Sequence, residues 1–300
     1  MDLHHLKIFH IVARNLSFSK TAYELHISQP AISMQIKNLE DELGFKLLER
    51  YGRTIFLSKE GQIMYSYTQK IFDLVTEMES EVNIFKGKMV GKISIGASNT
   101  PGIHVLPQII GLFKEKHPDV KVNLHIGSTS EIHSKLIENE LDFAIIGGEI
   151  DLHKTFIVEK LVEDILVLIV SPSNPLSSHE YIDRKMLTNQ QYITHEESSQ
   201  LYKAMEKLIT KMKLPFNVVM TLGSIHAITH AVAANIGISF VPYTSVHTDI
   251  RMGLLKKVSV ENKVWKYPYS LVYNQKKNFT APILIILEMV RSQIKRIMAG

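Results

Sequence analysis

The sequence predicts a multidomain α/β protein in which a small helical module, a long helix and two α/β lobes follow one another. Short helical segments and a pair of extended segments fill the first sixty residues, and an unbroken helical pattern of apolar residues follows them. From Ile93 onward, short apolar strands alternate with helical segments, an order typical of parallel sheets. We expect domains at residues 1–59, 60–89 and 90–300, with a first lobe of 90–162 and 268–300 and a second of 163–267.

The composition is that of an ordinary globular protein. The chain has 300 residues, of which 45% are hydrophobic and 21% charged, and its net charge of +4 does not by itself indicate a nucleic-acid partner. The absence of cysteine excludes disulfides, thiol catalysis and thiolate metal sites. No apolar stretch approaches the roughly 18 residues of a membrane span, and the N-terminus lacks the pattern of an export signal. We therefore expect a cytoplasmic protein with no membrane partner.

Three helices are expected at the N-terminus. Apolar residues from Leu3 to Arg14 recur at spacings of three and four, which predicts a helix that faces a core. Ser17 is placed to cap a short second helix, from Phe18 to about Leu25. Ser28 is placed to cap a third helix, which Gly44 ends.

A β-hairpin and a long helix come next. Extended segments at Lys46–Arg50 and Thr54–Leu57 flank the turn residues Tyr51, Gly52 and Arg53, which predicts a hairpin wing. From Lys59 to Phe85 a helix is expected with a seam for a partner helix. The seam consists of Met64, Tyr67, Ile71, Leu74, Met78, Val82 and Phe85. Residues Gly87–Gly91 then form a linker.

The α/β region divides into two sets of elements. We expect strands at Ile93–Ala97, Val122–Ile126, Phe143–Ile146, Ile165–Val170, Gln191–Thr194, Val218–Leu222 and Gly237–Val241, and helices at Ile103–Lys116, Thr129–Asn139, Leu201–Met212 and Ile225–Ala234. A strand at Tyr269–Tyr273 and a last helix at Ala281–Ile297 remain, and they are free to return to the first lobe.

The second and third helices, joined by a short turn, have the geometry that places a helix in the major groove of DNA. Gln29 and Gln35 suit the edges of adenine or guanine, and Ser33 is small enough for close approach of the backbone. Lys37, Arg50 and Arg53 suit phosphates, and a wing arginine also suits the minor groove. The alternative is a generic three-helix module whose polar residues are merely solvated.

Charge does not decide between these two readings of the module. Residues Met1–Lys59 hold eight Lys or Arg and six Asp or Glu. DNA affinity would therefore require that Glu40, Asp41 and Glu42 face away from the phosphates.

A resemblance favours the first reading. The run from Leu16 to Glu40, LSFSKTAYELHISQPAISMQIKNLE, resembles the DNA-binding segment of LysR-type transcriptional regulators. The continuation through Leu43-Gly44, Leu47-Leu48-Glu49-Arg50 and Leu57-Ser58-Lys59-Glu60-Gly61 is similar to the wing of that family and the entry to its linker helix, and length and domain order agree over the whole chain. Met34 stands where many members carry arginine, so no DNA contact is expected from that position.

The resemblance implies a winged helix-turn-helix that binds double-stranded DNA, a dimerising linker helix and an effector domain like a periplasmic solute-binding protein, usually assembled as a homotetramer. RNA polymerase is a further candidate partner. The residues expected to contact DNA are Ser17, Phe18, Ser19, Ser28, Gln29, Pro30, Ala31, Ser33, Gln35, Lys37, Arg50 and Arg53.

Ligands of open α/β sheets bind beyond the carboxyl ends of the strands, at the starts of the following helices. Hydroxyl groups recur at these junctions, an arrangement that suits a small anion or carboxylate between the lobes. The expected effector-binding residues are Ser98, Asn99, Thr100, Ser128, Thr129, Gly147, Ser198, Ser199 and Ser224.

Each junction residue has a simpler alternative role. Ser128 with Glu131 forms a capping box, and Ser198 and Ser224 are likewise placed to cap helices. Glu196 and Glu197 would repel a simple dianion if they faced the cleft, and would favour an effector that also carries an amine.

Other classes of function have less support. No catalytic motif, cofactor motif or zinc-binding H-E-x-x-H occurs, so we expect neither an enzyme nor a metal site. Two alternatives to an effector-controlled regulator remain: a ligand-independent regulator whose C-terminal domain only oligomerises, and a solute-binding module for transport. Effector-dependent stabilisation would separate a sensing domain from a merely structural one.

Overall fold

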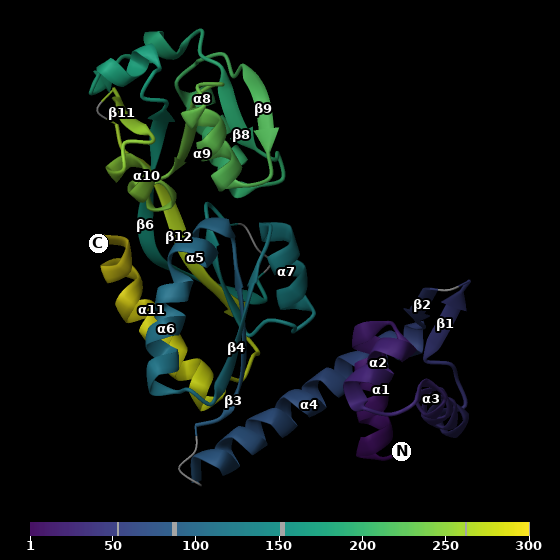
Figure 1. The fold of residues 1–300 in the computed structure, drawn as a ribbon. Coiled ribbons are helices and arrows are strands. Elements are labelled where there is room, and N and C mark those ends of the chain that lie inside the picture. The colour runs from purple at the N-terminus through teal and green to yellow at the C-terminus, as the bar shows by residue number, and fades with distance from the viewer. Residues whose placement is uncertain (53, 86–88, 151–153, 262, 300) are drawn as a thin grey trace. The chain divides into compact units, whose positions relative to one another are not determined.

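The computed structural model describes residues 1–52, 54–85, 89–150, 154–261 and 263–299 (Figure 1). Arg53 and part of the expected linker Gly87–Gly91 lie outside the described residues. The chain divides into two compact units, Met1–Val82 and Asn83–Gly300.

The first unit contains the three expected helices, α1 (Leu3–Asn15), α2 (Phe18–Leu25) and α3 (Gln29–Leu43). Each begins at a side-chain cap, from Asp2, Ser17 and Ser28 respectively. Their apolar faces meet in one core that includes Phe9, Val12, Ile32 and Leu39, all fully buried.

A hairpin and a long helix complete this unit. Strands β1 (Leu48–Tyr51) and β2 (Thr54–Leu57) pair antiparallel as the expected wing. Helix α4 (Lys59–Phe85) then runs for 27 residues. The start of this helix packs closely against the backbone just before β1. A Cβ at Gly61 would lie 2.1 Å from the carbonyl oxygen of Leu47, so only glycine fits there.

The second unit begins with a parallel sheet. Strands β3 (Gly91–Ala97), β4 (Val120–Ile126) and β5 (Phe143–Gly147) pair in the order β4-β3-β5, as the alternation of strands and helices predicts. Helix α7 (Thr129–Ile137) precedes β5. The predicted helix Ile103–Lys116 is wrong as a single element, because the chain forms α5 (Asn99–His104) and α6 (Leu106–Lys116), with a proline in the first turn of α6.

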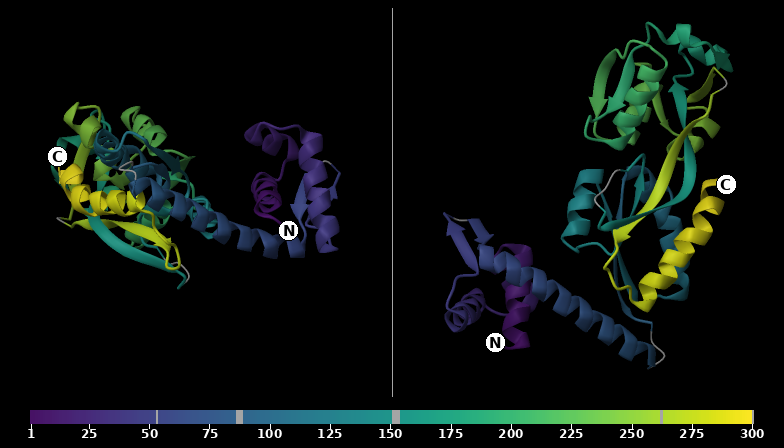
Figure 2. Two further views of the ribbon diagram at one scale, coloured as in Figure 1. Left: turned by 90° about the horizontal axis from the view of Figure 1, so that it is seen from below. Right: turned by 180° about the vertical axis from the view of Figure 1, so that it is seen from behind.

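Two long antiparallel strands, β6 (Phe156–Val170) and β12 (Trp265–Asn274), join the two lobes (Figure 2). The predicted strand Ile165–Val170 is therefore too short, since β6 begins nine residues earlier, in a segment where apolar residues are interrupted by charged ones and most side chains are only partly buried. β12 pairs with β5 over Tyr269–Val272 and with β6 along its whole length. We call the part with β3–β5, α5–α7 and α11 (Ala281–Ala299) lobe I.

Lobe II holds the remaining elements. Strands β10 (Ser239–Pro242) and β11 (Lys256–Val260) both pair antiparallel with β6, and the short β7 (Tyr181–Ile182) pairs with β11. A separate parallel pair consists of β8 (Tyr192–His195) and β9 (Val218–Leu222). The lobe's helices are α8 (Gln200–Lys211), α9 (Ile225–Ala233), α10 (His247–Arg251) and the 3-10 helices η1 (Pro175–Ser178), η2 (Arg184–Leu187) and η3 (Tyr243–Ser245).

Candidate functional site

The start of α3 presents polar residues at the surface of the first unit. Gln29 and Lys37 are exposed, and Ser33 between them is half-buried. Ser28 accepts a hydrogen bond from the backbone N–H of Ala31 at 3.4 Å, so its hydroxyl fixes the start of the helix. Of the remaining expected contacts, Pro30 and Ser19 are exposed, and Ser17 and Ala31 are half-buried.

Two of the expected DNA contacts turn inward. The side chain of Phe18 is 8% exposed and belongs to the core, and the guanidinium of Arg50 lies over its ring at 5.1 Å from the centroid. The amide oxygen of Gln35 is buried and has no hydrogen-bond partner among the described residues. Phe18 therefore positions Arg50, and the amide oxygen of Gln35 does not face solvent.

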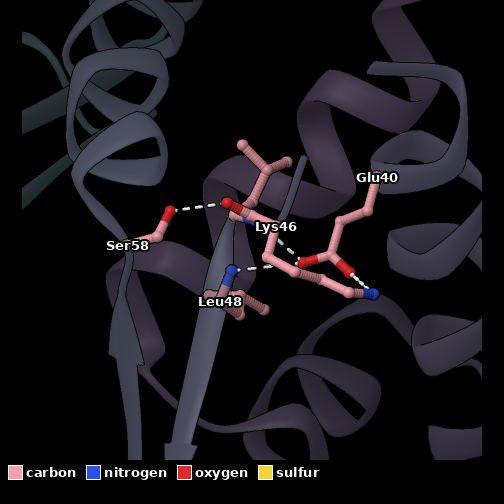
Figure 3. Close-up of polar contacts among 5 residues, drawn as sticks. Glu40, Lys46, Leu48 and Ser58 are labelled. Carbon is pink, nitrogen blue, oxygen red and sulfur yellow. Dashed lines mark hydrogen bonds and ion pairs between the residues drawn. The ribbon is translucent and has the colours of Figure 1, made fainter. Parts of the chain in front are cut away.

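Glu40 anchors the wing to α3 (Figure 3). Its side chain is 7% exposed and accepts hydrogen bonds from the backbone N–H groups of Leu47 at 2.8 Å and Leu48 at 3.2 Å, and from the ammonium of Lys46 at 2.7 Å. Ser58 completes the joint, because its hydroxyl donates to the carbonyl oxygen of Lys46 at 2.7 Å. The carboxylate is thus used inside the module and does not contribute a free negative charge at its surface.

In the second unit a cavity of 230 Å³ is lined by residues of both lobes. Lobe I contributes the ends of β3, β4 and β5 with the starts of α5 and α7, and lobe II contributes the ends of β8 and β9 with the starts of α8 and α9. The lining residues are Ser98, Asn99, Thr100, Gly127, Ser128, Thr129, Gly147, His195, Glu196, Ser198, Ser199, Gln200, Leu201, Gly223, Ile225 and Tyr267. Eight of the nine expected effector-binding residues are therefore brought together.

The ninth, Ser224, is absent from the lining and makes no side-chain cap for α9. Three other serines do have structural partners. Ser98 accepts from the backbone N–H of Gly147 at 2.9 Å, Ser128 caps α7 at 3.2 Å, and Ser199 caps α8 at 3.0 Å. Each of these hydroxyls still has its hydrogen to donate to a ligand.

The capping box predicted for Ser128 and Glu131 forms only in part. Ser128 accepts from the backbone N–H of Glu131, but the Glu131 carboxylate contacts Nε2 of His125 at 2.7 Å instead of turning back. This carboxylate is thereby held outside the cavity lining.

One acidic residue does face the cavity. Glu196 lines it and Glu197 does not. A Cβ at Gly223 would lie 2.9 Å from Oε1 of Glu196, so the glycine leaves room for this carboxylate. Beside it, burial lowers the pKa of His195, while the charge of Glu196 raises it.

A series of polar contacts connects the cavity with the paired strands β6 and β12. Thr100, which is 5% exposed, lies close enough to Tyr269 to offset part of the rise that burial causes in the pKa of this phenol, and the Tyr269 hydroxyl donates to Oδ2 of Asp164 at 2.7 Å. Asp164 also accepts from the backbone N–H of Thr244 in lobe II at 3.3 Å. Burial raises the pKa of Asp164, because its 5% exposed carboxyl has little water around it.

Sequence reasoning missed some lining residues. His195, Glu196, Gly127, Gly223 and Ile225 belong to the strand–helix junctions, so the junction rule could have included them. Tyr267 could not be found in this way, since it comes from β12, far along the chain from the other residues. A Cβ at Gly147 would lie 2.9 Å from the ring of Tyr267, which explains why glycine suits that junction.

The described residues contain no cluster of three His, Asp or Glu side chains that could hold a metal ion. No helix in this part of the chain is both long and apolar enough to span a membrane.

A winged helix-turn-helix and a two-lobed α/β domain with a polar cavity define a DNA-binding transcription regulator with a ligand-binding domain. Family models agree, since "Bacterial regulatory helix-turn-helix protein, lysR family" matches residues 3–62 and "LysR substrate binding domain" matches residues 86–295. The chain belongs to the LysR family of transcriptional regulators, with an N-terminal DNA-binding domain and a C-terminal effector-binding domain.

Individual proteins show the same similarity. A probable RuBisCO transcriptional regulator of Trichormus variabilis is 33% identical over 277 residues, which cover 91% of this chain and 82% of that protein. A full-length OxyR variant from Pseudomonas aeruginosa has a TM-score of 0.76 at 21% identity, over 98% of this chain and 95% of the other. Full-length CbnR complexed with its target DNA has a TM-score of 0.67 at 20% identity, over 99% and 100%.

Proposed function

We propose that this regulator binds a small anionic effector in the 230 Å³ cavity between its lobes, and that the effector controls how it acts on DNA. The observation that supports this most is the convergence of eight expected residues, seven of them polar, from both lobes on one cavity. A ligand there contacts both lobes at once, so it stabilises one relative arrangement of the lobes over others.

The chemistry of the lining indicates the effector class. The starts of α7, α8 and α9 supply backbone N–H groups and the positive ends of helix dipoles, which favour a carboxylate or phosphate. Glu196 favours a second group that donates hydrogen bonds, either an ammonium or a hydroxyl. The proposed effector is therefore a compact molecule with one anionic group and one donor group, such as an amino acid or a hydroxy acid. The proposed contact residues are those of the lining, and Ser224 acts only through its position before α9.

DNA readout is assigned to the start of α3. Gln29 and Ser33 are proposed to contact base edges, with Lys37 and Arg50 on phosphates. The similarity to CbnR, which is seen with its target DNA, supports this orientation of the module. Ser17, Ser19, Ser28, Pro30 and Ala31 are proposed to approach the DNA backbone from the starts of the two helices.

Self-association is assigned to α4. Tyr67, Leu74, Met78 and Val82 are 45–62% exposed on this helix, an apolar row that is buried when a second α4 packs against it. A dimer presents two winged modules to two half-sites, and the proposed assembly is a tetramer of two such dimers. The proposed domain limits remain 1–59, 60–89 and 90–300. We also propose a cytoplasmic location and no catalytic activity.

A ligand screen tests this function. The purified chain is screened by thermal shift against amino acids, hydroxy acids and phosphorylated acids, and each hit is then tested by footprinting on DNA upstream of its own gene. A hit raises the unfolding temperature and changes the footprint. If specific DNA binding occurs but no compound has any effect, the regulator is ligand-independent and the effector assignment is wrong.

A matched pair of variants locates the site. Thr100→Val removes a hydroxyl from the cavity. Thr229→Val is its control, because Thr229 lies in α9 outside the cavity lining and, like Thr100, is 5% exposed. We expect Thr100→Val to weaken effector binding about tenfold, since a hydrogen bond contributes about 1 kcal/mol or somewhat more. Equal effects of the two variants would show that the effector binds elsewhere.

A further inference from the structure

A second cavity, of 580 Å³, is lined by residues of both lobes and shares no lining residue with the effector cavity. It lies among α5, α6, η3, α10 and the end of α11. The residues that line it are His104, Gln108, Leu112, Tyr243, Thr244, His247, Arg251, Gln293, Arg296, Ile297 and Met298. The lining has two arginines and two histidines but no carboxylate.

The two arginines differ from the others that the structure describes. Arg14, Arg184 and Arg291 pair with carboxylates, and Arg50 lies over an aromatic ring. Within the described ranges, Arg251 and Arg296 have no hydrogen-bond or ion-pair partner, and both line this cavity. Both side chains are exposed at this cavity, so their guanidinium groups can donate hydrogen bonds to an anion there.

The histidines contribute polar ring nitrogens to the lining. Burial lowers the pKa of His104, and the charges of His226 and His247 lower it further. The His104 and His226 ring centroids are 5.9 Å apart. Asp249 acts in the opposite direction on His104, but it lies outside the cavity lining. The surroundings of His104 thus favour its neutral imidazole, which has one N–H to donate to a ligand.

The size and walls of the cavity indicate an organic anion. Its volume falls within the range of about 300–1,000 Å³ that is typical of small-molecule sites. Leu112, Ile297 and Met298 provide an apolar wall, and the amides of Gln108 and Gln293 provide further hydrogen bonds. We propose that this cavity is a second ligand site, which binds a small metabolite carrying two or more phosphate or carboxylate groups through Arg251 and Arg296. Guanidinium groups bind both kinds of group in bidentate fashion.

A chain of contacts through Asp164 and Tyr269 connects this site with the effector cavity. Thr244 lines the second cavity, and its backbone N–H donates to Asp164 at 3.3 Å. Asp164 accepts from Tyr269, which lies beside Thr100 of the effector cavity. Because both ligands act on contacts that hold the two lobes together, each is expected to change the affinity of the other by the same factor.

Calorimetric titration of the full chain tests the site, with pyrophosphate and citrate as the phosphate and carboxylate probes. Arg251→Gln/Arg296→Gln removes both guanidinium groups, and Lys185→Gln/Lys203→Gln removes the same charge from exposed positions of lobe II outside this cavity. We expect at least one probe to bind saturably, and the arginine variant to raise its Kd roughly thirtyfold while the lysine variant leaves it within about twofold.

Other outcomes would overturn the second site. Saturable binding that survives in the arginine variant would place the anion elsewhere, for instance on the DNA-binding surface. Equal weakening in both double variants would reveal only a response to net charge, and the absence of saturable binding by both probes would contradict the proposal directly. The titrations use the probes alone, with no effector present, so their outcome is independent of the outcome of the effector screen.

Discussion

The hydroxyl of Tyr269 donates a 2.7 Å hydrogen bond to Oδ2 of Asp164, and both side chains are buried. Asp164 lies on β6 and Tyr269 on β12, at the place where these strands pass between the lobes. The only register shift in their pairing falls between Tyr269 and Ser270. A change in the angle between the lobes would therefore alter this contact.

Tyr269→Phe is the first prediction, because it removes this hydrogen bond with little change in volume. The free energy of unfolding should fall by about 1–3 kcal/mol, the usual effect of leaving a buried polar group without its partner. The effector response should also weaken, because Tyr269 lies beside Thr100 of the effector cavity. Chemical denaturation and effector titration measure the two effects. Tyr181→Phe, at a site that is 48% exposed, is the control, and comparable losses in both variants would refute the role of the buried contact.

The second prediction concerns DNA readout by Gln29 and Ser33. Their joint exchange for alanine should abolish the preference for the cognate site over unrelated DNA, because bidentate base contacts each contribute roughly 1–3 kcal/mol of discrimination. Competition binding measures this ratio at fixed salt concentration. Lys37→Gln is the matched comparison, and it should weaken binding to all sequences alike and lower the salt dependence. If the alanine variant keeps its sequence preference, the base contacts lie on other residues.

The third prediction follows from the anchor at Glu40. Glu40→Ala leaves the backbone N–H groups of Leu47 and Leu48 without an acceptor, so the wing should loosen from α3. We expect about 1–3 kcal/mol less stability in the first unit and weaker DNA binding, because Arg50 follows on β1. Hydrogen exchange of the hairpin amides reports the loosening. Asp41→Ala changes an exposed neighbour, and exchange as fast as in Glu40→Ala would argue against the anchor.

Local chemistry explains which features the sequence predicts well. Ser17, Ser28 and Ser128 cap helices in the structure as predicted, and a cap depends only on residues within one turn. The caps predicted at Ser198 and Ser224 are wrong, because Ser199 caps α8 and the Ser224 side chain makes no cap for α9. The junction residues of each lobe could be grouped because strand ends of a parallel sheet meet at one edge, although β3–β5 and β8–β9 belong to separate sheets.

Features that depend on distant partners could not be predicted in this way. Tyr267 reaches the effector cavity only because β12 returns between β5 and β6. The first half of β6 has half-exposed residues whose pattern alone does not show that they pair with β12. The inward turn of the Gln35 amide oxygen likewise depends on neighbours in three dimensions, one residue away from the apolar face of α3.

The last prediction concerns His10, a residue of α1 whose side chain contacts α4. Its ring stacks near Tyr65 and Phe72, at centroid distances of 5.4 and 5.2 Å, and Nδ1 lies 3.3 Å from the hydroxyl of Thr68. Burial, followed by the charge of Arg14, lowers the pKa of His10 from 6.5 to about 4. The folded state therefore holds the neutral imidazole at a pH where the unfolded chain takes up a proton.

The sign of the pH effect follows from this difference. Above pH 6.5 His10 is neutral in both states and the linkage costs nothing, whereas stability falls as the pH drops from 6.5 towards 4, by up to about 1.4 kcal/mol per pH unit. His10→Gln should remove this part of the acid sensitivity. Urea unfolding between pH 7.5 and 4.5, read by hydrogen exchange of α1 peptides pulsed at one fixed pH, measures it. The exposed His4→Gln is the control, and His10→Gln with the same loss of stability on acidification as the unaltered chain would mean that the buried imidazole does not titrate in this range.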